Sequence, residues 1–580
     1  MVTLFAYWDQ LSYGFTDVDV QPLILTGRFG SLQDIWSILT EPLMKGMMVN
    51  ALYWRPVTSL SYGLDALIWD IDPIGYHLTD LCLHMATGLI LFSFVRRLWR
   101  ELGRPGATEI ASVATFLFVL HPVNVENVPA IARRAEILVG LFLIGTLWFL
   151  LAGFRRSAVW PGLAAQAGCI LGMGSKESGF AIPLVGLVFV VCCHPGCDRA
   201  SRAQKMTLAA PLLAWGGIVF ALRGLVLREM GGAEMATQGP AWWRLPYSVW
   251  LHFVGLILPG SSRFFDFPRP DDLVSGVGNL VQEHPIALVT IGVGGLCAAH
   301  LGMQKIGWSR SSNRLLVFLL GGMGALFLVY SQVVYDTRYL YPSALFFSAL
   351  LAWWLWEAIQ AVRRPGPILE RFPAGLALLG LGLLAISLIV VSPLVSHDGI
   401  DEWGDSAAIS QQALEQVEDR VAGLSPGSRV FLVNFPYRVD RSLIPGSIML
   451  LEHSVQGWLD LRLPEKNLEV VGLSYLYFEY PIRDLEVDVR MNPDRRLRIS
   501  VSGQGGATGF PWSTQYGPHY EGSLYEFVGS RQGQNLEIQL LEEVTDPEPV
   551  FLVWAGNGVQ LERGWNWHAR MTGEENAAGL

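Results

Sequence analysis

Hydrophobic residues in the first two thirds of the chain form long runs that short polar segments separate. Runs of this length are typical of membrane-spanning helices. After about residue 395 the runs shorten and begin to alternate with polar residues, which is typical of a soluble domain. The long runs lie at Leu78–Leu98, Ile110–Leu120, Ile137–Phe154, Ala158–Met173, Phe180–Cys193, Leu208–Leu227, Pro285–Met303, Leu315–Val334, Tyr339–Ala358 and Ala374–Val395.

The pattern therefore predicts a polytopic α-helical membrane protein with about 10–11 transmembrane helices, followed by a soluble domain. We place the membrane domain at residues 1–395 and the soluble domain at residues 396–580.

Clusters of Arg and Lys between the runs predict the orientation of the helices, because cytoplasmic loops carry an excess of these residues. The clusters agree with alternate crossing only if Trp242–Leu258 does not span. We interpret that segment as a re-entrant or interfacial helix on the outer face. The clusters are Arg96/Arg97/Arg100/Arg104, Arg155/Arg156, Arg199/Arg202/Lys205, Lys305/Arg310/Arg314 and Arg363/Arg364/Arg371.

This orientation places residues 14–77, a first external loop, on the outer face together with the C-terminal domain. Met1–Tyr13 is too short and polar to span a membrane or to be a cleavable signal peptide. We therefore expect that a late start codon has truncated the first helix. An integral protein of the bacterial inner membrane, with its active face outside the cytoplasm, is the predicted localisation.

The C-terminal domain combines two helix patterns with several strand patterns, which predicts an α+β fold. Asp401–Ala422 reads as an amphipathic helix and Ser447–Leu463 as a second helix, whereas the tail after Thr572 has the composition of a disordered segment. The predicted strands are Arg429–Tyr437, Leu468–Phe478, Leu485–Val489, Leu497–Ser502, Leu536–Leu541 and Val550–Trp554.

Composition excludes a purely soluble enzyme and a disordered protein, since 51% of the 580 residues are hydrophobic and 16% are charged, with a mean hydropathy of +0.35. Residues 396–580 hold 14 basic and 27 acidic residues, a net charge of −13. Binding to a phosphate backbone needs Lys and Arg, so nucleic acid is not an expected partner. All six cysteines precede this domain, which must therefore fold without disulfides.

Two carboxylates, Asp17 and Asp19, stand two residues apart in the first external loop. Such a pair next to a bilayer could act as a general base or hold a divalent cation through its oxygens. The alternative is a solvated loop, because most charged residues lie on the surface. We expect no cofactor and assign no residue as a metal ligand.

Further ionisable residues lie at the outer ends of predicted helices, where such groups often mark a functional site. Each could instead form a helix-end ion pair or anchor its helix at the interface. Arg223 and Arg338 are fixed positive charges on the predicted outer face, and a guanidinium group suits phosphate. The other residues in this group are His121, Glu126, Arg133, Arg134, Glu136, Lys176 and Glu177.

Four sequence stretches resemble the bacterial relatives of the transmembrane and tetratricopeptide-repeat O-mannosyltransferases, within the GT-C glycosyltransferase superfamily. They follow Gly14-Phe15, Asp17 and Asp19 in the order found in that family. No 34-residue helical repeat follows the last predicted membrane helix. The four stretches are YWRPVTSLSYGLDALIWDIDPIGYHLTDLCLHMATGLI, FVLHPVNVENVPAIARRAEILVGLF, SKESGFAIPLV and RYLYPSALF.

The resemblance implies an inverting glycosyltransferase that moves a sugar from a polyprenyl-phosphate carrier to an envelope glycan or protein at the outer face. It places Asp17 or Asp19 as the catalytic carboxylate and Arg134, Lys176 and Arg338 as candidates for the donor phosphate. Other functions remain open: a lipid-linked glycan transporter or a non-catalytic envelope scaffold. Acceptor-binding or orienting roles fall to Trp54, Arg55, His77, His121, Glu126, Glu136, Glu177 and Tyr339.

Overall fold

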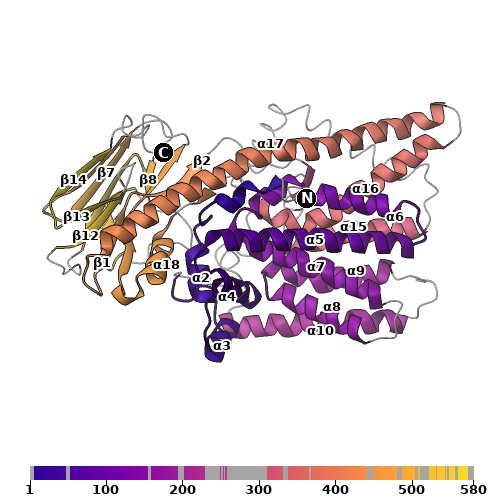
Figure 1. The fold of residues 1–580 in the computed structure, drawn as a ribbon, viewed down its shortest axis with the longest axis horizontal. Coiled ribbons are helices and arrows are strands. Elements are labelled where there is room, and N and C mark those ends of the chain that lie inside the picture. Colours follow the sequence, from indigo (N-terminus) through magenta and orange to yellow (C-terminus); the bar gives the residue numbers. More distant parts are fainter. Residues whose placement is uncertain are drawn as a thin grey trace.

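The computed structural model describes residues 6–47, 53–153, 159–193, 202–228, 310–330, 337–364 and 368–440, most of 447–571 and a few residues of 249–257. The predicted run Pro285–Met303, most of Trp242–Leu258 and the tail after Thr572 lie outside these residues. Helices form one body of the described structure and strands form most of the other, as expected (Figure 1).

Among the described residues, eight helices form the bundle. They are α5 (Pro73–Glu101), α6 (Ala107–Val119), α7 (Arg134–Gly153), α8 (Trp160–Met173), α9 (Ile182–Cys193), α10 (Arg202–Leu227), α15 (Arg310–Tyr330) and α16 (Tyr341–Arg363).

Five segments of the described residues are long and apolar enough to cross a membrane: Pro73–Glu101, Ile131–Gly153, Ala210–Leu227, Ser312–Tyr330 and Thr337–Arg363. The helix α6 has 13 residues, a rise of about 20 Å, and so is shorter than a full span. The chain thus has the helices of an integral membrane protein.

The turn η1 (Asp9–Ser12) precedes the predicted first external loop, which folds into α2 (Val20–Gly27), α3 (Leu32–Thr40) and α4 (Pro56–Trp69). Local sequence explains two of the helix starts. Ser31 and Asp34 form a reciprocal capping box at α3, and the Asp72 side chain caps α5, whose first residue is Pro73.

Short 3-10 turns carry the polar motifs between the bundle helices: η2 (Pro122–Glu126), η3 (Ile131–Arg133), η4 (Glu177–Ala181) and η7 (Thr337–Leu340). The turns η2 and η7 contact each other. Asn127 donates to the carbonyl of Arg338 at 3.2 Å. Motifs far apart in the sequence therefore meet at one end of the bundle.

A single 54-residue helix, α17 (Ile368–Val421), joins the bundle to the C-terminal domain and runs through residue 395, where the sequence places the boundary (Figure 1). It contains the predicted amphipathic helix. It also contacts η1 and η2. At Gly404 an added Cβ would lie 2.7 Å from the ring of Tyr13, so glycine permits this close approach.

The described residues of the C-terminal domain form three sheets, ordered β13-β12-β1-β4, β10-β8-β5-β2-β3 and β14-β6-β7-β11-β9, together with helix α18 (Glu452–Arg462). The strands are β1 (Arg429–Val433), β2 (Phe435–Asp440), β3 (Ser447–Ile448), β4 (Glu469–Gly472), β5 (Tyr475–Glu479), β6 (Glu486–Met491), β7 (Arg496–Ser502), β8 (Ala507–Gly509), β9 (Tyr525–Phe527), β10 (Gln532–Gly533), β11 (Asn535–Leu540), β12 (Val550–Trp554), β13 (Val559–Arg563) and β14 (Trp567–Met571).

The α+β prediction is confirmed, and every predicted strand region contains a strand. Arg429–Tyr437 and Leu468–Phe478 each divide into two strands. The strand β12 is buried throughout because it lies in the middle of a sheet, paired in parallel with β1. In β7, buried residues alternate with exposed or partly exposed ones, as expected for a strand that is covered on one face.

The buried hydrophobic residues form two clusters, and these do not follow the two domains predicted from the sequence. One cluster fills the helix bundle, and a second unites the C-terminal domain with the first external loop. Phe15, Val18 and Val20 belong to this second cluster. In addition, α18 contacts α2. The first external loop is therefore packed between the bundle and the C-terminal domain.

Candidate functional site

Asp17 lies in a strained and largely buried position between the two bodies. Its backbone φ is +81°, a region that L-residues rarely occupy. Its side chain is 8% exposed. One carboxylate oxygen accepts from the backbone N–H of Val18 at 2.7 Å, and the other accepts from Nε of Arg133 at 3.1 Å. Burial raises the pKa of this carboxyl above its ordinary value, and Arg133 opposes that shift.

Arg133 links Asp17 to the turn η2 and to α17. Its guanidinium group forms an ion pair with the Glu126 carboxylate and donates to the Glu126 carbonyl at 3.1 Å. It also lies 4.8 Å from the ring centre of Trp403 on α17. Through Trp403 the linking helix therefore contacts the same Arg133 guanidinium that binds Asp17.

Asp19 turns toward the C-terminal domain. Its Oδ1 lies 3.1 Å from Nε2 of His453 on α18. The hydroxyl of Ser454 donates to the carbonyl of Val18 at 2.7 Å, and Val18 is buried. The two acids that the sequence treats as a pair therefore have different partners.

Lys176 and Glu136 form a second charged group at the ends of the helices. Nζ of Lys176 lies 2.7 Å from Oε1 of Glu136 and 4.8 Å from the ring centre of Tyr339. The hydroxyl of Tyr330 donates to the other Glu136 oxygen at 2.7 Å, and the rings of Tyr330 and Tyr339 stack at 4.8 Å. Burial lowers the pKa of Lys176 to about 8.

Arg338 connects these two groups electrostatically. Its positive charge lowers the pKa of Asp17 and also that of Lys176. Its guanidinium group lies 5.1 Å from the ring centre of Tyr339 and contacts the Tyr339 hydroxyl at 3.3 Å. A carboxylate from residue 17 and cations from residues 176 and 338 thus share one region.

Arg55 and Glu177 lie beside the Lys176 group. Nη2 of Arg55 lies 2.7 Å from Oε2 of Glu177, and Arg55 also covers the ring of Tyr53 at 4.4 Å. Arg223 interacts electrostatically with Glu177. These contacts add more positive than negative charge next to Lys176.

Arg134 lies apart from this region, in a fully buried ion cluster. Its guanidinium group pairs with Asp80 and lies 2.6 Å from Asp65, and it covers the ring of Tyr62 at 4.5 Å. The Arg134 side chain is 0% exposed. Two carboxylates enclose this cation, so the arrangement leaves no open face for a phosphate.

Three other predicted residues are buried and make contacts with the backbone. The indole of Trp54 donates to the Leu39 carbonyl at 2.9 Å. His77 lies 3.0 Å from the carbonyl of Gly14, and His121 lies 3.0 Å from that of Leu256. These contacts fit orienting roles better than direct contact with a ligand.

The described residues contain no group of three or more His, Cys, Asp or Glu side chains that could hold a metal ion. Asp17 and Asp19 have separate partners, Val18 and Arg133 for the first and His453 for the second. Three residues were missing from the predicted site: Arg133, Trp403 and His453. Arg133 stands in the quoted outer-face motif, whereas nothing in the sequence pattern distinguishes Trp403 or His453 from other residues of their helices.

No family model matches the chain. Among curated proteins it is similar to Tmtc3 of Drosophila melanogaster, a protein O-mannosyl-transferase, with 30% identity over 27% of this chain and 19% of that protein. Human TMTC3, of the same description, is 26% identical over 32% of this chain and 20% of that protein. The chain resembles the protein O-mannosyl-transferases. The match covers about a fifth of the length of these two relatives.

Solved structures give weaker likenesses. ArnT from Cupriavidus metallidurans, solved with undecaprenyl phosphate, has a TM-score of 0.41 and 12% identity, covering 83% of this chain and 92% of that one. The Archaeoglobus fulgidus oligosaccharyltransferase has a TM-score of 0.42 and 12% identity, covering 81% of this chain and 61% of that one. With scores this low, the functional argument depends on the residues themselves.

Proposed function

We propose that this chain is a GT-C glycosyltransferase that moves a sugar from a polyprenyl-phosphate carrier to an acceptor, with inversion, at the outer face of the bacterial inner membrane. The observation that carries the proposal is the contact between the turns η2 and η7. Asp17 is joined to η2 through Arg133 and Glu126. In η7, the ring of Tyr339 lies against both Lys176 and Arg338. Sugar transfer from a lipid phosphate needs these two kinds of group together: a base for the acceptor and cations for the phosphate.

Asp17 is the proposed base. As the acceptor oxygen attacks the anomeric carbon, its proton passes to the Asp17 carboxylate and the bond from that carbon to the phosphate oxygen breaks. The electron pair of this bond leaves with the lipid phosphate. An ordinary Asp is a weak base, and the raised pKa of Asp17 brings it closer to the pH of catalysis. Attack opposite the leaving phosphate inverts the anomeric centre.

Lys176 and Arg338 are the proposed phosphate ligands. Both lie beside Tyr339, and both carry positive charge where the leaving phosphate gains negative charge. Arg55 and Arg223 extend this positive region, while Glu136 and Glu177 hold Lys176 and Arg55 in place. Arg134 is not retained as a phosphate ligand because Asp65 and Asp80 already enclose it.

Asp19 has a supporting role in this proposal. Its contact with His453 fixes the segment that follows Asp17 against α18. It therefore positions the base and does not itself accept the proton.

The test is complementation of a strain that lacks the gene, with mass spectrometry of its envelope glycans and glycoproteins. Asp17→Asn should restore less than a thousandth of the transfer, about 4 kcal/mol of transition-state stabilisation, while the protein remains inserted and folded. Asp19→Asn should restore about a tenth. Asp9→Asn, an exposed acid in η1, is the matched control and should restore it fully.

Normal transfer by Asp17→Asn and by the double variant with Asp19→Asn would overturn the catalytic assignment. A null strain whose envelope glycans and glycoproteins are unchanged would overturn the proposed activity itself.

A further inference from the structure

Tyr330, the last residue of α15, contacts both of the groups that surround the Lys176 ammonium. Its ring lies almost parallel to that of Tyr339, with centres 4.8 Å apart and an angle of 16° between the planes. Its hydroxyl donates to Oε2 of Glu136 at 2.7 Å. Tyr330 is 3% exposed, and a hydrogen bond made away from water is electrostatically stronger. One buried side chain therefore joins the aromatic partner and the acidic partner of Lys176.

Lys176 completes a closed ring of four side chains. Its Nζ donates to Oε1 of Glu136 at 2.7 Å and lies 4.8 Å from the ring centre of Tyr339. The contacts therefore run from Tyr330 to Glu136, to Lys176, to Tyr339 and back to Tyr330. The four residues belong to α15, α7, the N-cap of η4 and η7. Each side chain has two neighbours in the ring, so Tyr330 bears on both restraints that hold the ammonium group.

Glu136 shares its charge between two donors. The side chain is fully buried. Oε1 accepts from Lys176 and Oε2 from Tyr330, each at 2.7 Å, and the hydroxyl of Ser178 adds a longer contact to Oε2 at 3.5 Å. A hydrogen bond to a charged group is roughly twice as strong as one between neutral groups. While Tyr330 donates, part of the carboxylate charge is neutralised at Oε2, so Glu136 attracts the Lys176 ammonium less strongly.

Charges on three neighbouring segments set the proton affinity of Lys176. Burial lowers its pKa most, Arg55 and Arg338 act in the same direction, and Glu136 opposes them, with a net value of about 8. The hydroxyl of Tyr330 acts on the carboxylate that opposes the other influences. It therefore affects the pH at which Lys176 loses its charge.

We propose that Tyr330 is a positioning residue of the donor site formed by Lys176 and Arg338. Through Glu136 and Tyr339 it fixes the Lys176 ammonium, and by sharing the charge of Glu136 it keeps that ammonium available to the phosphate group of the lipid. The role toward phosphate rests on the proposed function, whereas the effect of Tyr330 on Lys176 does not. Tyr330 does not touch the donor in this proposal.

Tyr330→Phe tests the hydroxyl because it keeps the stacked ring. Without the donor at Oε2, Glu136 should attract the Lys176 ammonium more strongly, so the positive charge should persist to a higher pH. The probe is polyprenyl phosphate, bound to the full chain in lipid nanodiscs between pH 7.5 and pH 10. The dissociation constant should begin to rise near pH 8 in wild type and about one pH unit higher in the variant.

A second measurement does not depend on the donor. Folding lowers the pKa of Lys176 from 10.5 to about 8, so the unfolded chain binds more protons between these values and the free energy of unfolding should rise from pH 8 to pH 10. In Tyr330→Phe the pKa of the folded state lies closer to 10.5. The rise should therefore shrink to about half of that in wild type, measured by unfolding in detergent.

The route through Glu136 is tested by a double-mutant comparison. In the Glu136→Gln background there is no carboxylate charge for the Tyr330 hydroxyl to share. Adding Tyr330→Phe to Glu136→Gln should therefore leave both pH dependences where Glu136→Gln alone puts them.

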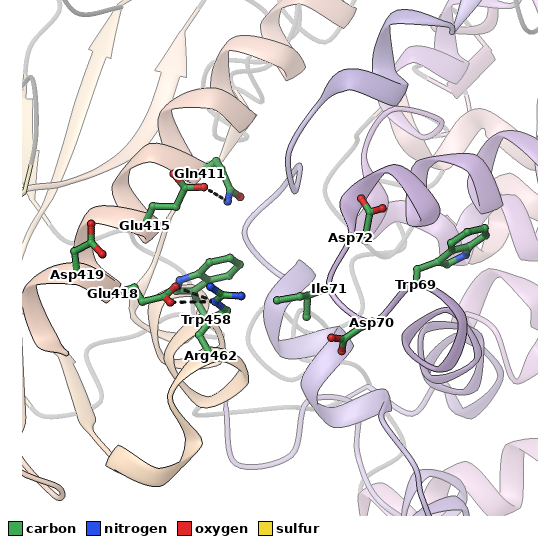
Figure 2. Close-up of a pocket in the computed structure, with 10 residues that line it drawn as sticks. All are labelled: Trp69, Asp70, Ile71, Asp72, Gln411, Glu415, Glu418, Asp419, Trp458 and Arg462. Atoms are coloured by element: carbon green, nitrogen blue, oxygen red, sulfur yellow. Dashed lines mark hydrogen bonds and ion pairs between the residues drawn. The ribbon is translucent and has the colours of Figure 1, made fainter.

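Two controls remove similar groups elsewhere. Tyr525→Phe removes a buried hydroxyl that donates to the Gly472 carbonyl at 3.1 Å in the C-terminal domain. Glu418→Gln removes the carboxylate that pairs with Arg462 at 3.0 Å, on one wall of a pocket of about 620 Å³ between the first external loop and the C-terminal domain (Figure 2). None of the four ring residues lines this pocket. Both controls should keep the wild-type pH dependences.

An unfolding increment in Tyr330→Phe equal to that of wild type would overturn the proposal, and so would the absence of any increment in wild type. The same effect of Tyr330→Phe with and without Glu136 would also overturn it. If polyprenyl phosphate binds independently of pH in wild type while the unfolding increment shrinks as expected, Lys176 is not a phosphate ligand. In that case the proposed donor site fails and the positioning of Lys176 by Tyr330 stands.

Discussion

Two buried groups of charges begin within three residues of each other in the sequence, at Arg134 and at Glu136, but they are built differently. In the first, one cation lies between two carboxylates, Asp65 and Asp80, and Arg134 is 0% exposed. In the second, Glu136 is fully buried but Lys176 keeps 12% of its side chain exposed, and Arg338 and Arg55 add further positive charge beside it.

The comparison shows how burial of charge can serve either structure or binding. A cation enclosed by carboxylates has its desolvation cost offset within the protein, so it holds the surrounding helices together. A group with more cations than carboxylates gains stability when an anion arrives. The Arg134 cluster is therefore assigned to folding and the Lys176 group to the donor phosphate.

The largest expected effect concerns Arg134. Arg134→Met leaves Asp65 and Asp80 buried without their cation, which should cost about 3–5 kcal/mol of unfolding free energy. The yield of monodisperse protein in detergent and its midpoint of thermal unfolding measure this loss. The triple variant Arg134→Met/Asp65→Asn/Asp80→Asn should recover part of it, because no unpaired charge then remains.

Arg338→Met is the matched control for that experiment and should unfold within about 2 °C of wild type, a change under about 1 kcal/mol. If Arg134→Met instead folds normally and loses only donor binding, the roles of the two groups are reversed from our assignment.

Arg338→Ala should raise the dissociation constant for polyprenyl phosphate about 30-fold, roughly 2 kcal/mol for the loss of a charged contact. Asp9→Asn, an exposed acid in η1, is the control and should bind polyprenyl phosphate as wild type does. Scintillation proximity or thermophoresis in nanodiscs measures both affinities. Equal donor affinity in wild type and variant would remove Arg338 from the site.

Lys176 should give the smallest effect, a pH dependence. Its pKa is lowered to about 8, so its positive charge is present below that pH and lost above it. The KM for the donor should therefore rise about fivefold between pH 8 and pH 9, as the protonated fraction falls from about one half to about one eleventh. Lys176→Arg should keep a nearly constant KM in this range, since arginine stays protonated.

The Lys176 ammonium group also makes the free energy of unfolding depend on pH. The pKa of Lys176 falls from 10.5 to about 8 on folding, so the unfolded chain binds more protons between these values. The contribution of Lys176 to the free energy of unfolding should therefore rise with pH across that window. In Lys176→Met this increment should be absent from unfolding curves measured at pH 8 and pH 10.

Much of the fold could be predicted because its signals are local. The run of apolar residues after Leu78 marks α5, and alternation marks β7. Six of the described strands were not predicted. Four of them, β3, β8, β9 and β10, have only two or three residues, which carry no usable period, and β3 lies at the start of Ser447–Leu463, which was predicted as a helix that instead begins at Glu452. The other two, β13 and β14, have five residues each and were also missed. That α17 continues unbroken past residue 395 also escaped prediction, because its apolar and amphipathic parts look like two separate elements.

The candidate site also has residues that could be predicted from the sequence and residues that could not. The sequence marks Asp17, Lys176 and Arg338 as charged residues at helix ends, where burial is costly and a function is expected. It could not separate Arg133 from Arg134, because neighbouring residues on a helix turn point in different directions and only their partners distinguish them. Trp403 and His453 reach the site from the C-terminal part of the chain, and no local pattern reports so distant a contact.

The sequence by itself determined which segments are apolar enough to cross a membrane, which part is rich in strands and which charges stand at the ends of the apolar segments, because each depends on residues close together in the chain. The tertiary structure alone decided which carboxylate faces which cation, that the first external loop shares a core with the C-terminal domain, and that a pocket opens between them. Those features depend on contacts between residues hundreds of positions apart, and only the packing of the whole chain fixes them.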